Sequence, residues 1–250
     1  MPVRTQGALE GLPVPELGRS REHVAKIHRH LRQLVMDEQL SPGAELNQAE
    51  LSRFYGVSRI PIREALRLLQ QEGLIEMERN QRAVVRQLDA GEVDQLYAIR
   101  ITLEGLGVRI TAGALTEQEH QEAESHLERM RQALVEHDMH RWIYEHRLFH
   151  QLCSARADTA LAHLIESLSE RSERYLRFAQ VVHPDTFARA ECEHREILHK
   201  VVVGDGAGAS HDMARHLATT AALVVRDLGG DAESGASACA TAMVTGQAHS

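Results

Sequence analysis

The sequence has few cysteines, few aromatic residues and no long apolar run. Its three cysteines, in 250 residues, are an odd number without the spacing of a disulfide framework, which indicates a reducing compartment. No apolar stretch approaches the ~20 residues that a transmembrane helix needs, and residues 1–20 lack the basic start and apolar core of a secretory signal. Aromatic residues make up only 4% of the chain, which leaves no obvious stacking platform for RNA or single-stranded DNA. We therefore expect a cytoplasmic protein with no membrane partner.

The net charge of −8 argues against a nucleic-acid-binding protein, but this charge is unevenly distributed. Residues 21–88 contain 11 Lys and Arg against 9 Asp and Glu, a net of +2, so the remaining residues carry −10. A slightly basic segment joined to an acidic remainder is typical of a DNA-facing module attached to a domain with another role. The length and the 43% hydrophobic content fit two globular domains.

The N-terminal third predicts a flexible leader, three helices and a β-hairpin. Residues 1–20 contain prolines and glycines and are expected to form the leader. Apolar residues at helical spacing predict helices over 22–38, 48–55 and 58–72. Two short β-prone segments, 74–78 and 83–87, flank a polar turn. This order of elements over residues 21–88 is that of a winged helix-turn-helix domain.

Long helices dominate the rest of the chain. Stretches with a period of 3.6 residues run over 90–114, 116–137, 138–156, 158–180, 185–203 and 207–227, which predicts an all-α six-helix bundle over residues 89–228. Residues 229–250 are rich in Gly, Ala and Ser without a charge pattern, and we expect them to be disordered. The predicted fold class is therefore mainly α, a winged helix-turn-helix followed by a six-helix bundle.

The third predicted helix carries a stripe of arginines. Ser58 suits the N-cap position, and Arg59, Arg63 and Arg67 are spaced i, i+4 and i+8, so they share one face. An isolated arginine stripe is more often a solvated helix face. In the third helix of a helix-turn-helix unit, however, guanidinium groups contact phosphates or the major-groove edge of guanine.

The run AELSRFYGVSRIPIREALRLLQQEGLI, preceded by SPGAEL, resembles the DNA-binding domain of the GntR family of regulators over about residues 24–85. The resemblance implies that Arg59 and Arg63 contact the operator. Two positions depart from the family pattern. The wing tip has Gln81-Arg82 where the family has Arg-Gly, so Arg82 is at most a substitute charge there, and Ala49 stands where relatives have an arginine.

Three of the bundle's predicted helices carry histidines on faces expected to point inward. His146 and His150 are spaced i, i+4, which lets two imidazoles chelate one metal ion, and His194 and His216 lie on two later helices. From spacing alone, an unrelated surface pair and two buried, hydrogen-bonded histidines are the more common arrangement. Other histidines, such as His28, lie on polar helix faces and are expected to be solvated.

The bundle also resembles the FCD domain of FadR-type GntR regulators, through LYAIRITLEGLGVRITA, FHQLC, EHREIL and ARHL. Metal-containing members bind one divalent ion with an Asp and three His, which match His150, His194 and His216, while the Asp position is His146 here. Glu145 is no replacement, because it lies about 100° around the helix. Either all four imidazoles bind the ion, or His146 lies away from the ion and does not coordinate it. An all-nitrogen set suits Zn²⁺, with Ni²⁺ or Cu²⁺ as alternatives, and keeps the full positive charge of the ion.

Arg100 matches the arginine that faces the ligand cavity in this family. Its planar fork suits a carboxylate, which predicts a small organic acid effector between the metal and Arg100. A structural salt bridge is an equally good explanation of this residue. Cys153 either approaches the metal or is an inert buried thiol.

The resemblance implies a metabolite-responsive transcription regulator rather than an enzyme. It implies a homodimer that binds a near-palindromic, double-stranded operator and acts by default as a repressor. Two alternatives stay open. One is a metal-dependent hydrolase that uses the histidine site, although the sequence shows no convincing general base beside it. The other is a pure metal sensor without an organic effector.

Overall fold

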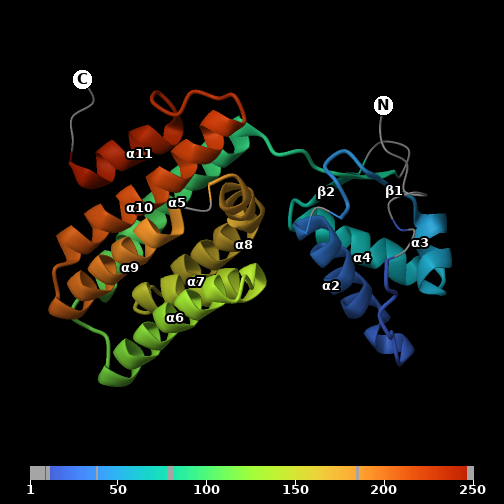
Figure 1. Ribbon diagram of the computed structural model, residues 1–250, viewed down its shortest axis with the longest axis horizontal. Coiled ribbons are helices and arrows are strands. Elements are labelled where there is room, and N and C mark those ends of the chain that lie inside the picture. Colours follow the sequence, from blue (N-terminus) through green and yellow to red (C-terminus); the bar gives the residue numbers. More distant parts are fainter. Residues whose placement is uncertain (1–8, 10–11, 38, 78–81, 184–185, 247–250) are drawn as a thin grey trace. The chain divides into compact units, whose positions relative to one another are not determined.

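The computed structural model describes the chain except for residues 1–8, 10–11, 38, 78–81, 184–185 and 247–250. It divides into two compact units, Met1–Leu88 and Asp89–Ser250. Figure 1 shows the first unit in blue to cyan and the second in green to red. In the described residues, no helix is both long and apolar enough to cross a membrane. Mostly helical structure with one small sheet confirms the predicted fold class.

The first unit is a helical core with a small antiparallel sheet. Its helices are the short 3₁₀ helix η1 (Ser20–Glu22), α2 (His23–Met36), α3 (Gln48–Tyr55) and α4 (Arg59–Gln71), and its strands are β1 (Glu45–Leu46), β2 (Ile75–Met77) and β3 (Ala83–Val85). The strand order is β1-β3-β2, with Ile75 opposite Val85. Strand β1 is an addition to the predicted hairpin, because two residues are too few to show an alternating pattern.

The helix boundaries of this unit follow from local capping. The Asn47 side chain accepts hydrogen bonds from the backbone of Ala49 and Glu50 at the start of α3. Gly56 ends this helix in the left-handed conformation, with φ of 64°. Ser58 occupies the N-cap of α4 as expected, but its side chain makes no capping hydrogen bond. The helix is therefore held by burial of Ile62, Leu66 and their neighbours rather than by its cap.

Glu72, just beyond α4, fixes this helix to α2. It accepts hydrogen bonds from His28 (2.5 Å) and from Arg32 (3.2 Å). Burial alone would raise the pKa of Glu72, but His28 and Arg32 outweigh burial and lower it. The expectation of a solvated His28 is therefore wrong, because the sequence does not show which carboxylate tertiary packing brings to it.

The leader expected over residues 1–20 is only partly described. Leu9 is buried, and Leu12 and Leu17 pack against the core of the first unit. The described part of the leader is therefore attached to the domain by apolar side chains, which differs from a freely flexible segment. The prolines and glycines that suggested flexibility did not indicate these contacts.

The second unit is a helical bundle built around α5. It contains α5 (Ala90–Thr111), α6 (Glu117–Val135), α7 (Met139–Cys153), α8 (Thr159–Val182), α9 (Thr186–Val203), α10 (Gly206–Asp227) and α11 (Ala236–Thr245). Helix α5 packs against α8, α10 and α11 (Figure 1). Helix α6 starts with a reciprocal capping box between Thr116 and Glu119. Because α7, α9 and α10 all belong to this bundle, their inward faces can share one site.

Helix α11 overturns the expectation of a disordered tail for residues 236–245. The carboxylate of Asp94, on α5, accepts hydrogen bonds from the backbone of Ala236 (2.6 Å) and Ser237 (3.0 Å). The small residues of α11 allow close approach to α5, where a Cβ on Gly105 would lie 3.1 Å from Val244. The cap comes from a residue 142 positions earlier, so the local composition gave no sign of it. The predicted tail at 247–250 lies outside the described residues.

Candidate functional site

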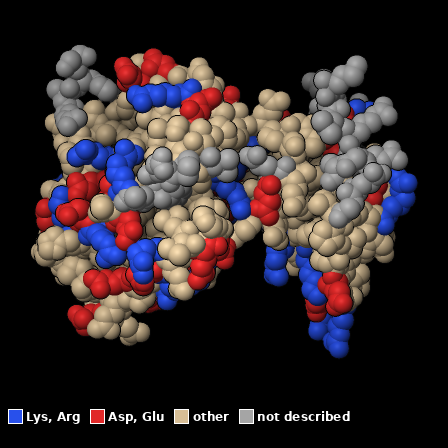
Figure 2. Space-filling model, in the orientation of Figure 1, with Lys and Arg blue, Asp and Glu red and all other residues tan. Residues whose placement is uncertain are grey.

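The arginine stripe of α4 lies on the surface of the first unit. Arg59, Arg63 and Arg67 are all exposed, while Ile62 and Leu66 on the opposite face are buried. Glu64 lies within 3.8 Å of Arg63 and 3.2 Å of Arg67. These surface ion pairs are weak and screened by salt, so a phosphate or a base can replace the carboxylate. On the face seen in Figure 2, basic and acidic side chains are interspersed rather than gathered into one basic patch.

The wing of the first unit is described only at its base. Arg82 precedes β3, is exposed, and lies 3.5 Å from Glu45. The turn at Arg79, Asn80 and Gln81 lies outside the described residues. The described part therefore places Arg82 next to the sheet with a carboxylate partner.

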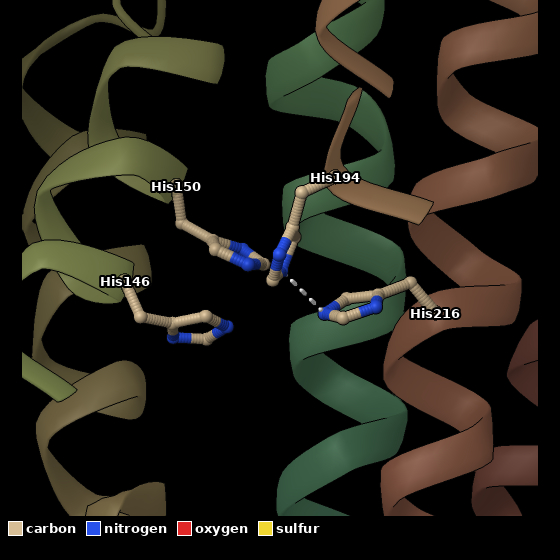
Figure 3. Close-up of side chains that lie close together, drawn as sticks. All are labelled: His146, His150, His194 and His216. Carbon is tan, nitrogen blue, oxygen red and sulfur yellow. Dashed lines mark hydrogen bonds between the residues drawn. The ribbon is translucent and has the colours of Figure 1, made fainter. Parts of the chain in front are cut away.

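In the second unit, four histidines form one buried cluster. His146 and His150 come from α7, His194 from α9 and His216 from α10, and their imidazoles point toward one another (Figure 3). One nitrogen of each lies within 4.8 Å of one nitrogen of every other. All four side chains are buried, between 0% and 6% exposed. His146 therefore lies with the other three histidines rather than away from them.

Two glutamates fix the orientation of two of these rings. Nδ1 of His150 donates to Oε2 of Glu104 on α5 (2.8 Å), and Nδ1 of His216 donates to Oε2 of Glu193 on α9 (2.8 Å). A carboxylate only accepts, so the hydrogen of each neutral ring lies on Nδ1. The lone pair of Nε2 then faces the cluster on both rings. Carboxylates in this position are the usual outer partners of metal-binding histidines.

The protonation state of three histidines in the cluster suits a cation. Burial lowers the pKa of His146 and His194 well below the usual value, and neighbouring histidines lower both further. Burial also lowers the pKa of His150, although Glu104 opposes this shift. Neutral imidazole is the form of histidine that binds metal ions.

The nitrogen positions fit a metal ion. Nε2 of His194 lies 3.1 Å from Nε2 of His216. Two nitrogens on one tetrahedral zinc lie about 3.3 Å apart. Nε2 of His150 is buried and has no hydrogen-bond partner among the described residues. These observations fit four imidazoles around one divalent cation.

Arg100 forms the structural salt bridge that was one of the two roles considered for it. Its side chain is 3% exposed, its Nε donates to Oε1 of Glu104 (2.7 Å), and Nη1 donates to Ser172 (2.8 Å). The structural salt bridge is therefore present. Glu104 accepts from Arg100 with one oxygen and from His150 with the other, so this single carboxylate joins the arginine to the histidine cluster.

A cavity lies beside the cluster and is shared by five helices. Its wall includes Arg100, His146 and His216, together with polar and apolar residues of α5, α7, α8, α9 and α10: Tyr97, Trp142, Leu176, Thr186, Arg189, Glu193, Leu217, Thr219, Thr220 and Leu223. The Trp142 ring stacks on His146, with centroids 4.7 Å apart and planes at 18°. Arg100 and two of the four histidines therefore share the wall of one cavity.

The structure excludes two residues from the cluster and adds two partners that the sequence did not reveal. Glu145 accepts hydrogen bonds from His126 (2.6 Å) and Arg129 (2.8 Å). Cys153 is buried, burial raises the pKa of its thiol, and it is not one of the four grouped ligands. Glu104 and Glu193 were missed as outer partners. The only sequence signal for Glu104 was its i, i+4 spacing from Arg100.

These outer carboxylates also correct the expected charge of the site. With imidazole ligands alone, the site was expected to keep the full charge of the ion. Glu104 and Glu193 each lie directly behind one imidazole, and Arg100 offsets the first of them. Part of the charge of an ion bound here would therefore be compensated by Glu104 and Glu193.

Comparisons with known proteins agree with the two units. Residues 23–85 match the model of the bacterial regulatory proteins of the gntR family, and residues 95–219 match the FCD domain. The HTH-type transcriptional repressor RspR of Escherichia coli is 29% identical over 195 residues, 77% of this chain and 84% of that protein. The uncharacterized regulator YdhC of Bacillus subtilis is 27% identical over 205 residues, 80% of this chain and 90% of that protein.

A solved structure shows the same arrangement of elements. The E. coli McbR/YncC structure has a TM-score of 0.68 and 25% sequence identity, and the match covers 82% of this chain and 98% of that one. These relatives are named as transcription regulators, so the hydrolase alternative is not supported. The chain belongs to the GntR family, in the group with an FCD domain, and is a DNA-binding transcription regulator.

Proposed function

We propose that this chain is a metabolite-responsive repressor whose second unit binds a divalent metal ion and a small carboxylate effector. It binds a near-palindromic operator as a homodimer in the cytoplasm. The observation that carries the sensing part is the buried set of four histidines beside a cavity that also contains Arg100. The printed name of RspR, a transcriptional repressor, supports repression as the direction of control.

Helix α4 is the proposed reading element for DNA. Arg59, Arg63 and Arg67 are exposed along one face of a helix whose opposite face is buried in the domain core. The N-terminal residues of a recognition helix contact base edges, which gives Arg59 and Arg63 the base-reading positions. Arg67, Ser58 and Arg82 are proposed to contact the phosphate backbone.

The histidine cluster would hold the metal, with zinc as the first candidate and nickel as the second. When bound, the ion supplies a positive centre at the edge of the cavity that attracts an anion. The chain's own residues do the rest. Glu104 and Glu193 orient two of the rings, and Arg100 offers a buried guanidinium to a carboxylate on the wall of the same cavity.

Binding of the effector and of DNA must be thermodynamically linked if the effector regulates the protein. A repressor is released from DNA when the effector binds the DNA-free protein more tightly than the DNA-bound protein. By reciprocity, DNA weakens effector binding by the same factor by which the effector weakens DNA binding. A pure metal sensor would show this linkage with the metal alone.

The experiment is a DNA-binding titration with the full chain. A duplex selected from a random pool is titrated at physiological salt with metal-free protein, with zinc-loaded protein, and with zinc-loaded protein plus a panel of small carboxylates. We expect specific binding that at least one acid weakens tenfold or more. Regulation by zinc alone, unchanged by every acid, would favour the pure metal sensor. An absence of any preferred duplex would contradict the proposed operator binding.

A further inference from the structure

The first turn of α4 carries an exposed isoleucine on the same side as the arginines. Ile60 is 65% exposed, more than any other large apolar side chain in the described part of the first unit. With 3.6 residues per turn, it lies about 20° around the helix from Arg67 and about 60° from Arg63. Ile62 and Leu66 belong to the buried face of the same helix. The isoleucine therefore has the same surroundings as the arginine stripe.

The neighbours of Ile60 distinguish it from a scattered apolar residue on a protein surface. A single exposed apolar side chain is common and by itself indicates nothing. Here the nearby side chains on the outer face of α4 are those of Arg59, Arg63, Glu64 and Arg67, and Glu64 lies within 3.2 Å of Arg67. Ile60 is thus the apolar member of an otherwise charged face. If this face enters the major groove, the isoleucine enters with it.

The major groove of DNA presents one apolar substituent to such a side chain. The base edges carry hydrogen-bond donors and acceptors, and the exception is the C5-methyl group of thymine. An isoleucine placed against a polar edge would remove water from it without offering a hydrogen bond in return, which costs free energy. A β-branched side chain also has one strongly preferred rotamer in a helix, so its methyl groups point in a defined direction. Contact with a thymine methyl is therefore the favourable contact for Ile60.

We propose that Ile60 is a specificity-determining residue that recognises a thymine of the operator through its C5-methyl group. This inference rests on the proposed function, since it takes α4 as the element that reads DNA. Arg63 lies three residues, about 4.5 Å, further along the helix axis. Successive base pairs are about 3.4 Å apart, so the thymine lies within about two base pairs of a guanine that Arg59 or Arg63 contacts.

Replacement of thymine by deoxyuridine removes this methyl group and leaves the hydrogen-bonding groups of the base in place. The preferred duplex is selected from a random pool with the full chain, and each of its thymines is then replaced in turn. We expect one thymine in each half-site at which wild type loses about fourfold in affinity, the effect of one methyl group withdrawn from an apolar contact. At this thymine, Ile60→Ala should bind both duplexes equally, and Ile60→Val should retain most of the discrimination.

The comparison between variants separates a direct contact from an effect on DNA shape. A methyl group that acts through the stiffness of the duplex would matter equally to Ile60→Ala and to wild type, and this result overturns the inference. A wild type that is insensitive to every deoxyuridine, or a preferred duplex without thymine near its guanines, overturns it as well. A chain that prefers no duplex contradicts the proposed operator binding, and the inference fails with it.

Val14→Ala is the matched control, because Val14 is also an exposed apolar residue of the first unit (49%) but lies outside α4. It should discriminate thymine from deoxyuridine as wild type does, and a control that loses the discrimination would overturn the assignment to Ile60. Thermal unfolding provides an independent measurement. Substitution of an exposed residue changes stability little, so Ile60→Ala should keep the melting temperature of wild type. A decrease of several degrees would show that the isoleucine stabilises the domain and would overturn its role in reading DNA.

Discussion

Replacement of Glu104 by glutamine should weaken metal binding and also destabilise the helical unit. Glu104 is completely buried and accepts from Arg100 with Oε1 (2.7 Å) and from His150 with Oε2 (2.8 Å). Burial alone would raise the pKa of Glu104, but Arg100 and His150 lower it to about 2, so the carboxylate is ionised at neutral pH. A glutamine has one acceptor oxygen, so only one of the two partners can keep its hydrogen bond.

The two losses have different magnitudes. If the amide oxygen keeps its hydrogen bond to Arg100, the amide NH₂ group faces the Nδ1–H of His150, and two donors oppose each other. The imidazole must then move its hydrogen to Nε2, so it loses the Nε2 lone pair that faces the cluster. Loss of such an outer partner lowers metal affinity by about 10- to 100-fold. The buried Arg100 also loses its counter-ion while keeping Ser172, and uncompensated buried charges cost roughly 3–5 kcal/mol.

Glu193→Gln is the matched comparison. Glu193 is the outer partner of His216, but its side chain is 30% exposed and its ion pair with Arg189 lies at the surface. We expect about a tenfold loss of metal affinity and less than about 1 kcal/mol of stability. Metal affinity is measured by competition with a chromophoric chelator, and stability by urea unfolding of the metal-free protein. A Glu104→Gln protein with wild-type metal affinity, or with wild-type stability, would refute this account of Glu104.

Three further predictions concern the other sites. Arg63→Ala should lower operator affinity by roughly 1–3 kcal/mol if Arg63 reads a base. Arg29→Ala, on α2, is the control. An Arg63→Ala protein that loses equal affinity for specific and random duplexes would contradict base reading. His194→Ala should lower both the bound zinc per chain and the melting temperature; a full complement of zinc would exclude His194 as a ligand. Glu72→Gln should destabilise the first unit at pH 7. Because the folded-state pKa of Glu72 is lowered, this difference is fully present above the usual glutamate pKa and disappears as the pH falls through the lowered value. Urea titrations across pH measure it, and an unchanged difference at low pH would be inconsistent with this linkage.

The sequence predicted those parts of the fold that depend on local patterns. The 3.6-residue period predicted the order of α2 to α10 and the bounds of these helices within a few residues. Helix α11 was missed because it depends on Asp94, a cap that only the tertiary fold brings to it. The same limitation applies to His28, whose partner Glu72 lies 44 positions away.

The histidine cluster shows a similar division. Spacing grouped His146 with His150, but only the resemblance to a family connected them to His194 and His216, because nothing local links three helices. The outer carboxylates could not be predicted, since many glutamates lie on helices and only packing selects Glu104 and Glu193. The double role of Glu104 is visible only from the two distances to Arg100 and His150.

The charges around the cluster lead to one further consequence for sensing. A divalent ion held by four neutral imidazoles brings two positive charges, Arg100 adds a third, and Glu104 and Glu193 remove two. One positive charge then remains near the cavity. Arg189 is not counted, because its side chain is largely solvated. An unpaired charge in a buried site costs free energy, and a monocarboxylate in the cavity would neutralise it. Metal and effector should therefore bind cooperatively, and by reciprocity a bound acid strengthens metal binding by the same factor. An aspartate in place of His146 would remove that remaining charge and with it most of this cooperativity. The presence of histidine where the family has aspartate therefore favours a site that binds its metal most tightly when the acid is also bound.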